Sequence, residues 1–528
     1  MNPHEQTYLS TAASRQWQTL GIKHHHGIAL PLFSLHTQES SGIGEYCDLI
    51  PLIDWCHSLG MDIIQLLPLN DTGMDTSPYN GLSAFALNPL FISLSKLPYL
   101  SDVPDAQNQL RSLKEWSHTP RINWNLIRKL KMDFLFNYFQ KTYPQFSQDP
   151  SYQKFVRENS WLVSYCLFRT LKENQQWKSW EEWPSNLKSP SDKKFDELVS
   201  EHSERIHFFE LLQYLCYSQM SDVKEHAKSR GVFIKGDIPI LISRDSCDVW
   251  AYRSHFLLNL SAGAPPDMFS SEGQYWGFPI YDWQELRQQN YSWWQERLKL
   301  AEKIYHIYRI DHIVGFFRIW AIPKNRPAKE GEFLPREKSD RIPQGRAIME
   351  MMLRSCSLFP IGEDLGVVPT EVRTCLRELG ICGTKVIRWE RKWEVDDSFI
   401  PFSEYIPESM TTVSTHDSDT LQLWWRHSPK EAKAFAEFKG WDYKPLLSND
   451  RHYEILKDSH HSGSFFHINL LNEYLAMFPD LISANPLDER INMPGKILDT
   501  NWSYRFAKPL EDMVAHSDLN KTIKSLLS

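Results

Sequence analysis

The sequence lacks the closely spaced cysteines that most often indicate a metal or redox site. Its eight cysteines are scattered along the chain, and no two of them form a C-x-x-C motif. Pairs at that spacing are common ligands of structural zinc and the common reactive pair of redox proteins. We therefore expect reduced, structural thiols and no metal site.

Long apolar and long basic stretches are also missing. No uninterrupted run of 18 apolar residues occurs, and the N-terminus has neither the basic start nor the apolar core of a secretion signal. The formal net charge is −8, and no long run of Lys and Arg could bind a polyanion. These absences predict a cytoplasmic protein with no membrane and no nucleic-acid partner.

Three signatures of large protein classes are absent as well. The chain has no Gly-rich phosphate-binding loop, no G-x-S-x-G turn and no internal repeat. These absences argue against a P-loop nucleotide-binding protein, a serine hydrolase of the α/β type and a repeat array.

Three adjacent histidines, His24, His25 and His26, form a cluster that suggests a metal ion. They precede the apolar run 27–33, which is typical of a strand. Neighbouring side chains on an extended chain point to opposite faces, so the three imidazoles cannot share one ion. We therefore expect no metal there either.

The composition is that of an ordinary globular enzyme with many aromatic residues. Of the 528 residues, 41% are hydrophobic and 23% are charged, and the chain has 20 Trp, 21 Tyr and 28 Phe. The length indicates either two domains or one large barrel with insertions. Most of the aromatic side chains belong in a core, but some of them could stack on sugar rings or bases.

Strand-like and helix-like segments alternate along much of the chain. A strand over 27–33, a helix ending at Gly60 and a strand over 61–69 form a βαβ unit, which requires parallel strands. Further segments typical of strands are 231–240, the stretch from 308, 359–366, 383–389 and 410–420, with a helix over 345–357. This alternation predicts an α/β protein, a (β/α)8 TIM-type barrel with inserted helical and loop subdomains.

The texture of the sequence divides the chain into four parts. We expect an N-terminal extension over 1–26, the first part of the catalytic barrel over 27–100, a mainly helical insertion over 101–230, and the rest of the barrel over 231–528. The segments 70–94 and 242–283 are rich in Gly, Pro, Asn, Asp and Ser, and they are interpreted as long loops. The second is interpreted as a flap over a sugar or base. Tyr79 in the first either stacks on a ligand or anchors the loop.

Three acids follow strand-like segments, where parallel α/β folds place their ligand sites. Asp311 lies in YRIDHIVGFFRIW (308–320), Glu363 ends the strand 359–366, and Asp417 ends the strand 410–420. Asp237 follows an apolar strand in the same manner. Arg309 would keep Asp311 ionised, although a buried ion pair of these two residues that only stabilises the core is the alternative.

Convergent carboxylates without a metal favour glycosidic chemistry. One carboxylic acid protonates the leaving oxygen, and one carboxylate meets the oxocarbenium-like centre; at a separation of about 5 to 5.5 Å the second acts as a nucleophile and the configuration is retained. Glu363 would need a raised pKa to hold its proton near neutral pH.

Motifs spread over nearly the whole chain resemble those of one enzyme family. They are SPYNGLSAFALNP (77–89), KGDIPI (235–240), GAPPD (263–267), GQYWGFPIY (273–281), YRIDHIVGFFR (308–318), GEDLG (362–366), STHDSDT (414–420) and NMPG (492–495). In this order they are similar to the 4-α-glucanotransferases of glycoside hydrolase family 77, also called amylomaltases or disproportionating enzymes. The segments DIIQLLPLNDTG, STHDSDTLQLWW and AYRSHFLLNLSAGAPPD resemble the plant cytosolic branch in particular.

The resemblance implies a retaining double displacement that needs no cofactor. Asp311 would be the nucleophile, Glu363 the acid and base, and Asp417 the stabiliser of the transition state. Substrate-binding roles are implied for Tyr79, Asp237, Asp267, Gln274, Trp276, Arg309, His312, His416, Asn492 and Pro494. Covering loops near 263–277 and 491–496 would exclude water from the cleft.

The implied partners are α-1,4-glucans, namely maltose, maltodextrin and glycogen. The chain departs from the family pattern at Ser418, where an Asn is usual, and at 70–73, where NDTG replaces GPTG. These departures bear on which glucan lengths fit, and the plant cytosolic resemblance suggests a maltose donor with a branched-glucan acceptor. Two alternatives stay open: an α-1,4-glucan hydrolase with the same acids, and a non-catalytic glucan-binding protein.

Overall fold

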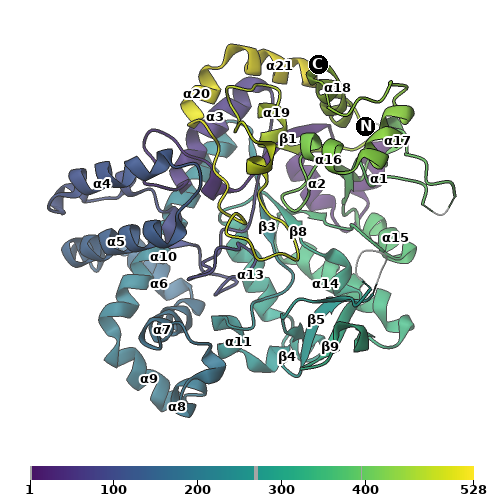
Figure 1. The fold of residues 1–528 in the computed structure, drawn as a ribbon. Helices are drawn as coiled ribbons and strands as arrows, with labels where there is room; N and C mark the ends of the chain where they lie inside the picture. The colour runs from purple at the N-terminus through teal and green to yellow at the C-terminus, as the bar shows by residue number, and fades with distance from the viewer. Residues whose placement is uncertain (1–2, 267–270, 394) are drawn as a thin grey trace.

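Eight parallel strands form the central sheet of the protein (Figure 1). We describe a computed structural model of the chain, which covers residues 3–266, 271–393 and 395–528. The strands neighbour one another in the order β11-β8-β3-β2-β1-β14-β13-β12. Their bounds are β1 His25–Leu30, β2 Ile63–Leu66, β3 Phe233–Ile238, β8 Ile307–Ile310, β11 Phe359–Gly362, β12 Gly383–Val386, β13 Ser409–Thr412 and β14 Phe466–Leu470. A parallel bridge between Ile361 and Cys382 joins the two outer strands, so the sheet closes into a barrel.

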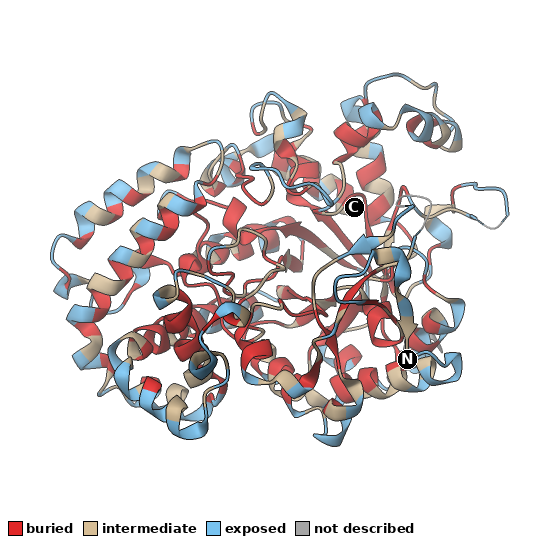
Figure 2. Cartoon of the chain, turned by 60° about the horizontal axis from the view of Figure 1, so that its bottom comes forward, coloured by how far each residue is buried: buried red, intermediate tan, exposed pale blue. Residues whose placement is uncertain are grey.

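The barrel strands are buried on both faces, as the near-continuous apolar segments predict (Figure 2). The βαβ unit at the start of the chain is confirmed: β1 and β2 pair in parallel and are joined by α3 (Leu49–Leu59), which ends at Gly60. Gly60 has φ +87°, a left-handed conformation that favours glycine at the end of a helix. The expected helix over 345–357 is the second half of α14 (Lys338–Ser355).

Helices surround the barrel and present their polar faces outward (Figure 2). Besides α3 and α14 they are α1 Pro3–Leu9, α2 Ser14–Leu20, α12 Trp283–Gln288, α13 Ser292–Glu302, α15 Thr370–Leu379, α16 Leu421–His427, α17 Pro429–Phe438, α18 Asn449–His460, α19 Leu471–Leu475, α20 Leu510–Ala515 and α21 Ser517–Leu527. None of the helices in the part of the chain that the structure covers is long and apolar enough to cross a membrane.

The segment between β2 and β3 is helical and projects to one side of the barrel (Figure 1). Its helices are α4 Ala106–Glu115, α5 Trp124–Phe146, α6 Pro150–Glu158, α7 Trp161–Asn174, α8 Ser185–Lys188, α9 Asp192–Glu201 and α10 Ser203–Ser229. The last of these packs against α3 and β3 and leads directly into β3. It therefore belongs to the helical layer around the barrel, and the other helices of the segment pack outward from it.

The interpretation of residues 242–283 as a long loop is wrong. The segment contains α11 (Cys247–Ala251) and the strands β4 (Phe256–Leu257), β5 (Leu260–Ala264), β6 (Gln274–Tyr275) and β7 (Ile280–Tyr281). Strand β5 pairs with β6 and with β9 (Ile319–Pro323), and β9 pairs with β10 (Glu332–Leu334), in an antiparallel sheet beside the barrel. The partner strand β9 lies far along the chain, so the local Gly and Pro content did not indicate this sheet.

The three adjacent histidines alternate between the two faces of β1, as an extended chain requires. His25 Nδ1 lies 2.8 Å from Asp62 Oδ2, whereas His24 and His26 both stack on the ring of His467 in β14. Within the described ranges, no group of three or more His, Cys, Asp or Glu residues is arranged to hold a metal ion. All eight cysteines are free thiols.

Candidate active site

Strand register brings Arg309 between two carboxylates. Arg309 of β8 is the direct partner of Asp237 on β3, and its Nη1 lies 2.9 and 2.8 Å from the two carboxylate oxygens of Asp237. Its Nη2 lies 2.9 Å from Oδ1 of Asp311, which follows the end of β8. Asp237 has a fully buried side chain, but that of Asp311 is 29% exposed. The ion pair is therefore open to a ligand on the Asp311 side.

A tight turn places Glu363 next to Asp311. His312, directly after Asp311, has φ +46°, a left-handed conformation that is uncommon outside glycine. This turn directs the backbone N–H of His312 at Glu363 Oε2, at 2.9 Å, while the N–H of Leu365 donates to Oε1 at 3.0 Å. Glu363 directly follows β11, the neighbour of β8 in the barrel. The two acids thus follow the carboxyl ends of neighbouring strands, and the N–H of the residue after Asp311 donates to Glu363.

Asp417 is held from the other side of the mouth. Its Oδ1 accepts a hydrogen bond from Asn492 Nδ2 at 2.7 Å, and its Oδ2 lies 3.2 Å from His416 Nε2. Tyr79 connects this pair to the others: its hydroxyl donates to Asp237 Oδ2 at 2.7 Å and lies 3.0 Å from His416 Nε2. One continuous polar network therefore runs from Asp311 through Asp237 and Tyr79 to Asp417.

The three acids differ in how readily they ionise. Burial raises the pKa of Asp311 to about 6, and it outweighs the opposing charge of Arg309. Burial also raises the pKa of Glu363, against Arg309 and the two backbone N–H groups that favour its charged form. Burial would also raise the pKa of Asp417. The charge of His416 and the hydrogen bonds from His416 and Asn492 outweigh burial, and the pKa of Asp417 is lowered to about 2. Burial therefore favours the protonated forms of Asp311 and Glu363, whereas Asp417 stays ionised.

Tyr79 contacts protein groups with both its hydroxyl and its ring. The ring stacks on that of His416 with centroids 5.4 Å apart, and Trp502 lies at 5.8 Å from Tyr79 and 5.9 Å from His416. Sequence reasoning missed Trp502, and it also missed Arg490, whose Nη2 donates to the Asp417 carbonyl at 3.3 Å. The NMPG motif marks the segment between them, but it gives no signal for Arg490 or Trp502 themselves, because the fold brings these two side chains to the site through contacts distant in sequence.

Three predicted residues are not part of the polar network, and a fourth lies outside the residues that the structure describes. Trp276 meets the ring of His312 edge-on at 5.1 Å, and its indole N–H donates to Gln274 Oε1 at 3.0 Å. Pro494 is exposed, two residues beyond Asn492. Asp267 lies outside the residues that the structure describes. Gln274, Trp276 and Pro494 therefore lie outside the polar network. The structure brings nine predicted residues together in or directly beside this network: Tyr79, Asp237, Arg309, Asp311, His312, Glu363, His416, Asp417 and Asn492.

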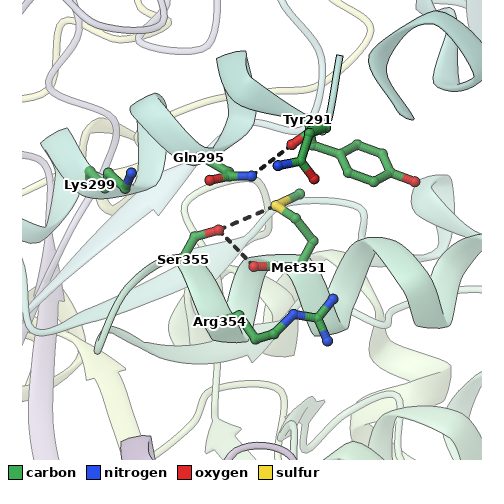
Figure 3. Close-up of a pocket in the computed structure, with 7 residues that line it drawn as sticks. Tyr291, Gln295, Lys299, Met351, Arg354 and Ser355 are labelled. Atoms are coloured by element: carbon green, nitrogen blue, oxygen red, sulfur yellow. Dashed lines mark hydrogen bonds between the residues drawn. The ribbon is translucent and has the colours of Figure 1, made fainter. Parts of the chain in front are cut away.

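A separate pocket lies between α13 and α14 on the outside of the barrel (Figure 3). It measures about 370 Å³ and is lined by Asn290, Tyr291, Gln295, Lys299, Met351, Arg354 and Ser355. None of the three acids or their partners lines it. This pocket is therefore not part of the candidate active site.

Comparison with known proteins decides the family. A model of the 4-alpha-glucanotransferase family, Glyco_hydro_77, matches residues 30–511. The chain belongs to this family. A 4-alpha-glucanotransferase of Chlamydia pneumoniae is 46% identical over 530 residues, which cover 100% of both chains. A family member of Clostridium butyricum is 31% identical over 87% of this chain and 91% of its own, and the rice 4-alpha-glucanotransferase DPE2 is 26% identical over 100% of this chain and 71% of its own.

Solved structures of amylomaltases have the same fold. The amylomaltase of Streptococcus agalactiae in complex with acarbose matches with a TM-score of 0.82 and 24% identity, over 96% of this chain and 99% of its own. That of Corynebacterium glutamicum matches with a TM-score of 0.78 and 19% identity, over 98% and 76%. The predicted (β/α)8 barrel is confirmed, as is the family resemblance that the motifs suggested.

Proposed function

We propose that this protein is a 4-alpha-glucanotransferase that works by retaining double displacement. It moves a glucosyl or maltooligosyl unit from an α-1,4-glucan, such as maltose or maltodextrin, to the 4-hydroxyl of another glucan or of glucose. The observation that carries the proposal is the pairing of Asp311 and Glu363 at one strand edge. There Arg309 contacts Asp311, and burial raises the pKa of Glu363. Family membership supports the same activity.

In the first step, the ionised carboxylate of Asp311 attacks the anomeric carbon while Glu363 gives its proton to the leaving glycosidic oxygen. This forms a covalent glycosyl ester on Asp311 and frees the shortened glucan. In the second step, Glu363 takes the proton of an acceptor 4-hydroxyl, which displaces Asp311 and restores the α-configuration. The two inversions at one carbon explain the retention.

The other members of the network bind and position the sugar. Asp417, whose pKa is lowered to about 2, stays ionised and stabilises the positive charge that develops on the ring in each transition state. Asp237 and Arg309 fix the orientation of Asp311. The family resemblance assigns contacts with sugar hydroxyls to His312 and His416, and aromatic contacts to Trp276 and to the face of Tyr79 that does not stack on His416.

Transfer rather than hydrolysis requires that water be kept from the glycosyl ester. We propose that the strands β5 and β6 and the segment 491–496 cover the cleft, with Gln274, Asn492 and Pro494 at the covering edge. Maltose and maltodextrin as donors and glycogen as acceptor are the substrates proposed.

Free thiols at all eight cysteines support a reducing, cytoplasmic location.

The test is to incubate the protein with maltose, with and without glycogen, and to follow free glucose and product chain length. Transfer predicts glucose together with maltotriose or longer chains, or glucose that appears only with glycogen and in step with outer-chain growth. Two glucose molecules per maltose without a longer product would instead establish an α-1,4-glucan hydrolase. Glycogen binding without any turnover would leave the non-catalytic alternative.

A further inference from the structure

Two tryptophans are exposed at the mouth of the barrel. The Trp389 side chain is 40% exposed and the Trp393 side chain 59%, and no other tryptophan in the described residues is as exposed as either. Burying an indole ring ordinarily stabilises a protein, so two indoles left near each other in water indicate a surface for another molecule. No role for them was apparent from the sequence motifs.

The loop that carries both rings starts at the catalytic edge of the sheet. Trp389 follows the end of β12, and its N–H donates to the Val386 carbonyl at 2.8 Å. In the closed barrel, β12 lies between β11, which leads to Glu363, and β13, which leads to Asp417. Arg388 Nη2 also donates to Ser418 Oγ at 2.9 Å, directly beside Asp417. The loop that carries the two rings therefore starts beside the proposed active site.

Trp393 is held in place by its surroundings. The chain turns back on itself, with an antiparallel bridge between Arg391 and Phe399. The Arg391 guanidinium lies 4.1 Å from the Phe399 ring centroid and 5.4 Å from that of Trp393. The indole N–H of Trp393 donates to the Trp389 carbonyl at 3.1 Å, so its polar atom is satisfied. The exposed part of Trp393 is therefore apolar ring surface. Because these contacts already fix the side chain, it loses little conformational entropy when a ligand binds.

We propose that Trp389 and Trp393 form a platform on which an α-1,4-glucan chain stacks outside the units at the reacting bond. The C–H faces of glucose rings are apolar and uncharged, which matches exposed indole faces. A glucan long enough to contact the acids and the platform at once gains contacts that a shorter glucan lacks. The platform rests on the proposed function, and it would make long or branched glucans such as glycogen better substrates than maltose.

The kinetic test compares glycogen with maltose as acceptor. In Trp393→Ala, we expect the preference for glycogen over maltose, as a ratio of kcat/KM values, to fall about tenfold through a higher KM for glycogen. Trp393→Phe should restore most of the preference. Tyr99→Ala removes a ring of similar exposure beside Phe146 of the helical segment, and it serves as the matched control. An unchanged ratio in Trp393→Ala, or an equal loss with both acceptors, would overturn the platform.

A binding test separates the platform from the proposed activity. In the Asp311→Asn background, migration through a gel that contains glycogen should be retarded, and Trp393→Ala should relieve most of that retardation. If the wild-type protein shows no transfer but the tryptophan substitution still relieves retardation, the proposed function fails and the platform stands. If transfer is present and retardation is the same with and without Trp393, the platform fails alone.

Discussion

At the scale of single residues, Arg309 controls the charge of the site. It is shared between Asp237 and Asp311, so neither carboxylate receives its full effect, and burial still raises the pKa of Asp311 to about 6. At neutral pH Asp311 is then mostly ionised, as a nucleophile must be. The charge of Arg309 also opposes burial at Glu363, but the pKa of that carboxyl group is still raised.

Replacement of Glu363 should test its role as the acid that protonates the leaving oxygen. We expect Glu363→Gln to lower kcat for maltose transfer by about 10²- to 10⁴-fold, because no group then protonates the leaving oxygen. A donor with a fluoride leaving group needs little protonation, so its first step should be largely restored. The exposed Glu371→Gln on α15 is the control. Equal losses with both donors in the first turnover, measured as the initial burst of released fluoride and of released glucose, would contradict the role.

The pH dependence follows from the same two acids. Below about pH 6, Asp311 is protonated and cannot attack, so kcat/KM should fall by about tenfold per pH unit on the acid side. On the alkaline side, activity should fall as Glu363 loses its proton. A pH series of initial rates checks both limbs. The alkaline limb should vanish in Glu363→Gln assayed with the fluoride donor, and its persistence would assign that limb to another group.

Sequence reasoning found the acids because their strand ends are local features. Asp311 and Glu363 follow short apolar runs, Asp417 follows a run rich in Thr, and parallel strands all end on the same side of the barrel. Trp502 and Arg490 come from a segment without periodicity, and only the complete fold brings them to the mouth. The residues missed are thus those whose place depends on long-range contacts.

At the scale of elements, one barrel strand escaped prediction. Strand β14 reads FHINL, and its His467 and Asn469 interrupt the apolar pattern. Both are fully buried because each has partners: His467 Nδ1 lies 2.7 Å from the Ser459 carbonyl, and Asn469 accepts from the Val413 N–H at 2.9 Å. Satisfied polar groups can replace apolar ones in a core, and no sequence pattern shows which polar groups will be satisfied.

The helical segment is joined to the barrel by a buried ion pair. Lys131 of α5 has no exposed side-chain surface, and it contacts Glu45 before α3 and the Ile92 carbonyl. Burial raises the pKa of Glu45 even beside this cation. The charge that remains after removal of one partner should therefore be costly.

We expect Lys131→Met to lower the free energy of unfolding by about 3 to 5 kcal/mol, measured by urea denaturation. The double variant Lys131→Met with Glu45→Gln should recover part of the loss, since no uncompensated charge remains. Lys129→Met on the exposed face of the same helix is the control. A loss in Lys131→Met no greater than in this control would show that the pair contributes little.

At the scale of the whole molecule, buried histidines close the barrel between β1 and β14. Burial lowers the pKa of His26 to about 4 and that of His467 to about 3, and a positive charge on His26 lowers the pKa of His467 further. Both rings are neutral in the folded state, whereas in the unfolded chain they take a proton below about pH 6.5. Their contribution to stability is therefore complete above that pH and is lost as the pH falls towards 4.

His467→Asn should make the protein less sensitive to acid. Between pH 6.5 and 4, the pH slope of the unfolding free energy should fall by about 1.4 kcal/mol per pH unit relative to wild type. Because several buried carboxyl groups with raised pKa values act in the opposite direction, the difference between variants is the quantity to measure. The same substitution at exposed His57 is the control. Parallel slopes for wild type and His467→Asn would contradict the account.

The covalent glycosyl ester on Asp311 is the central claim, and one measurement tests it most directly. Glu363→Gln treated with α-maltosyl fluoride should form the ester and resolve it slowly, so that peptide mass spectrometry detects it. We predict a glycosyl mass increment on the peptide that contains Asp311, absent when Asp311→Asn is added. Continued consumption of the donor without any adduct on Asp311, or an adduct on Asp417 instead, would contradict the mechanism.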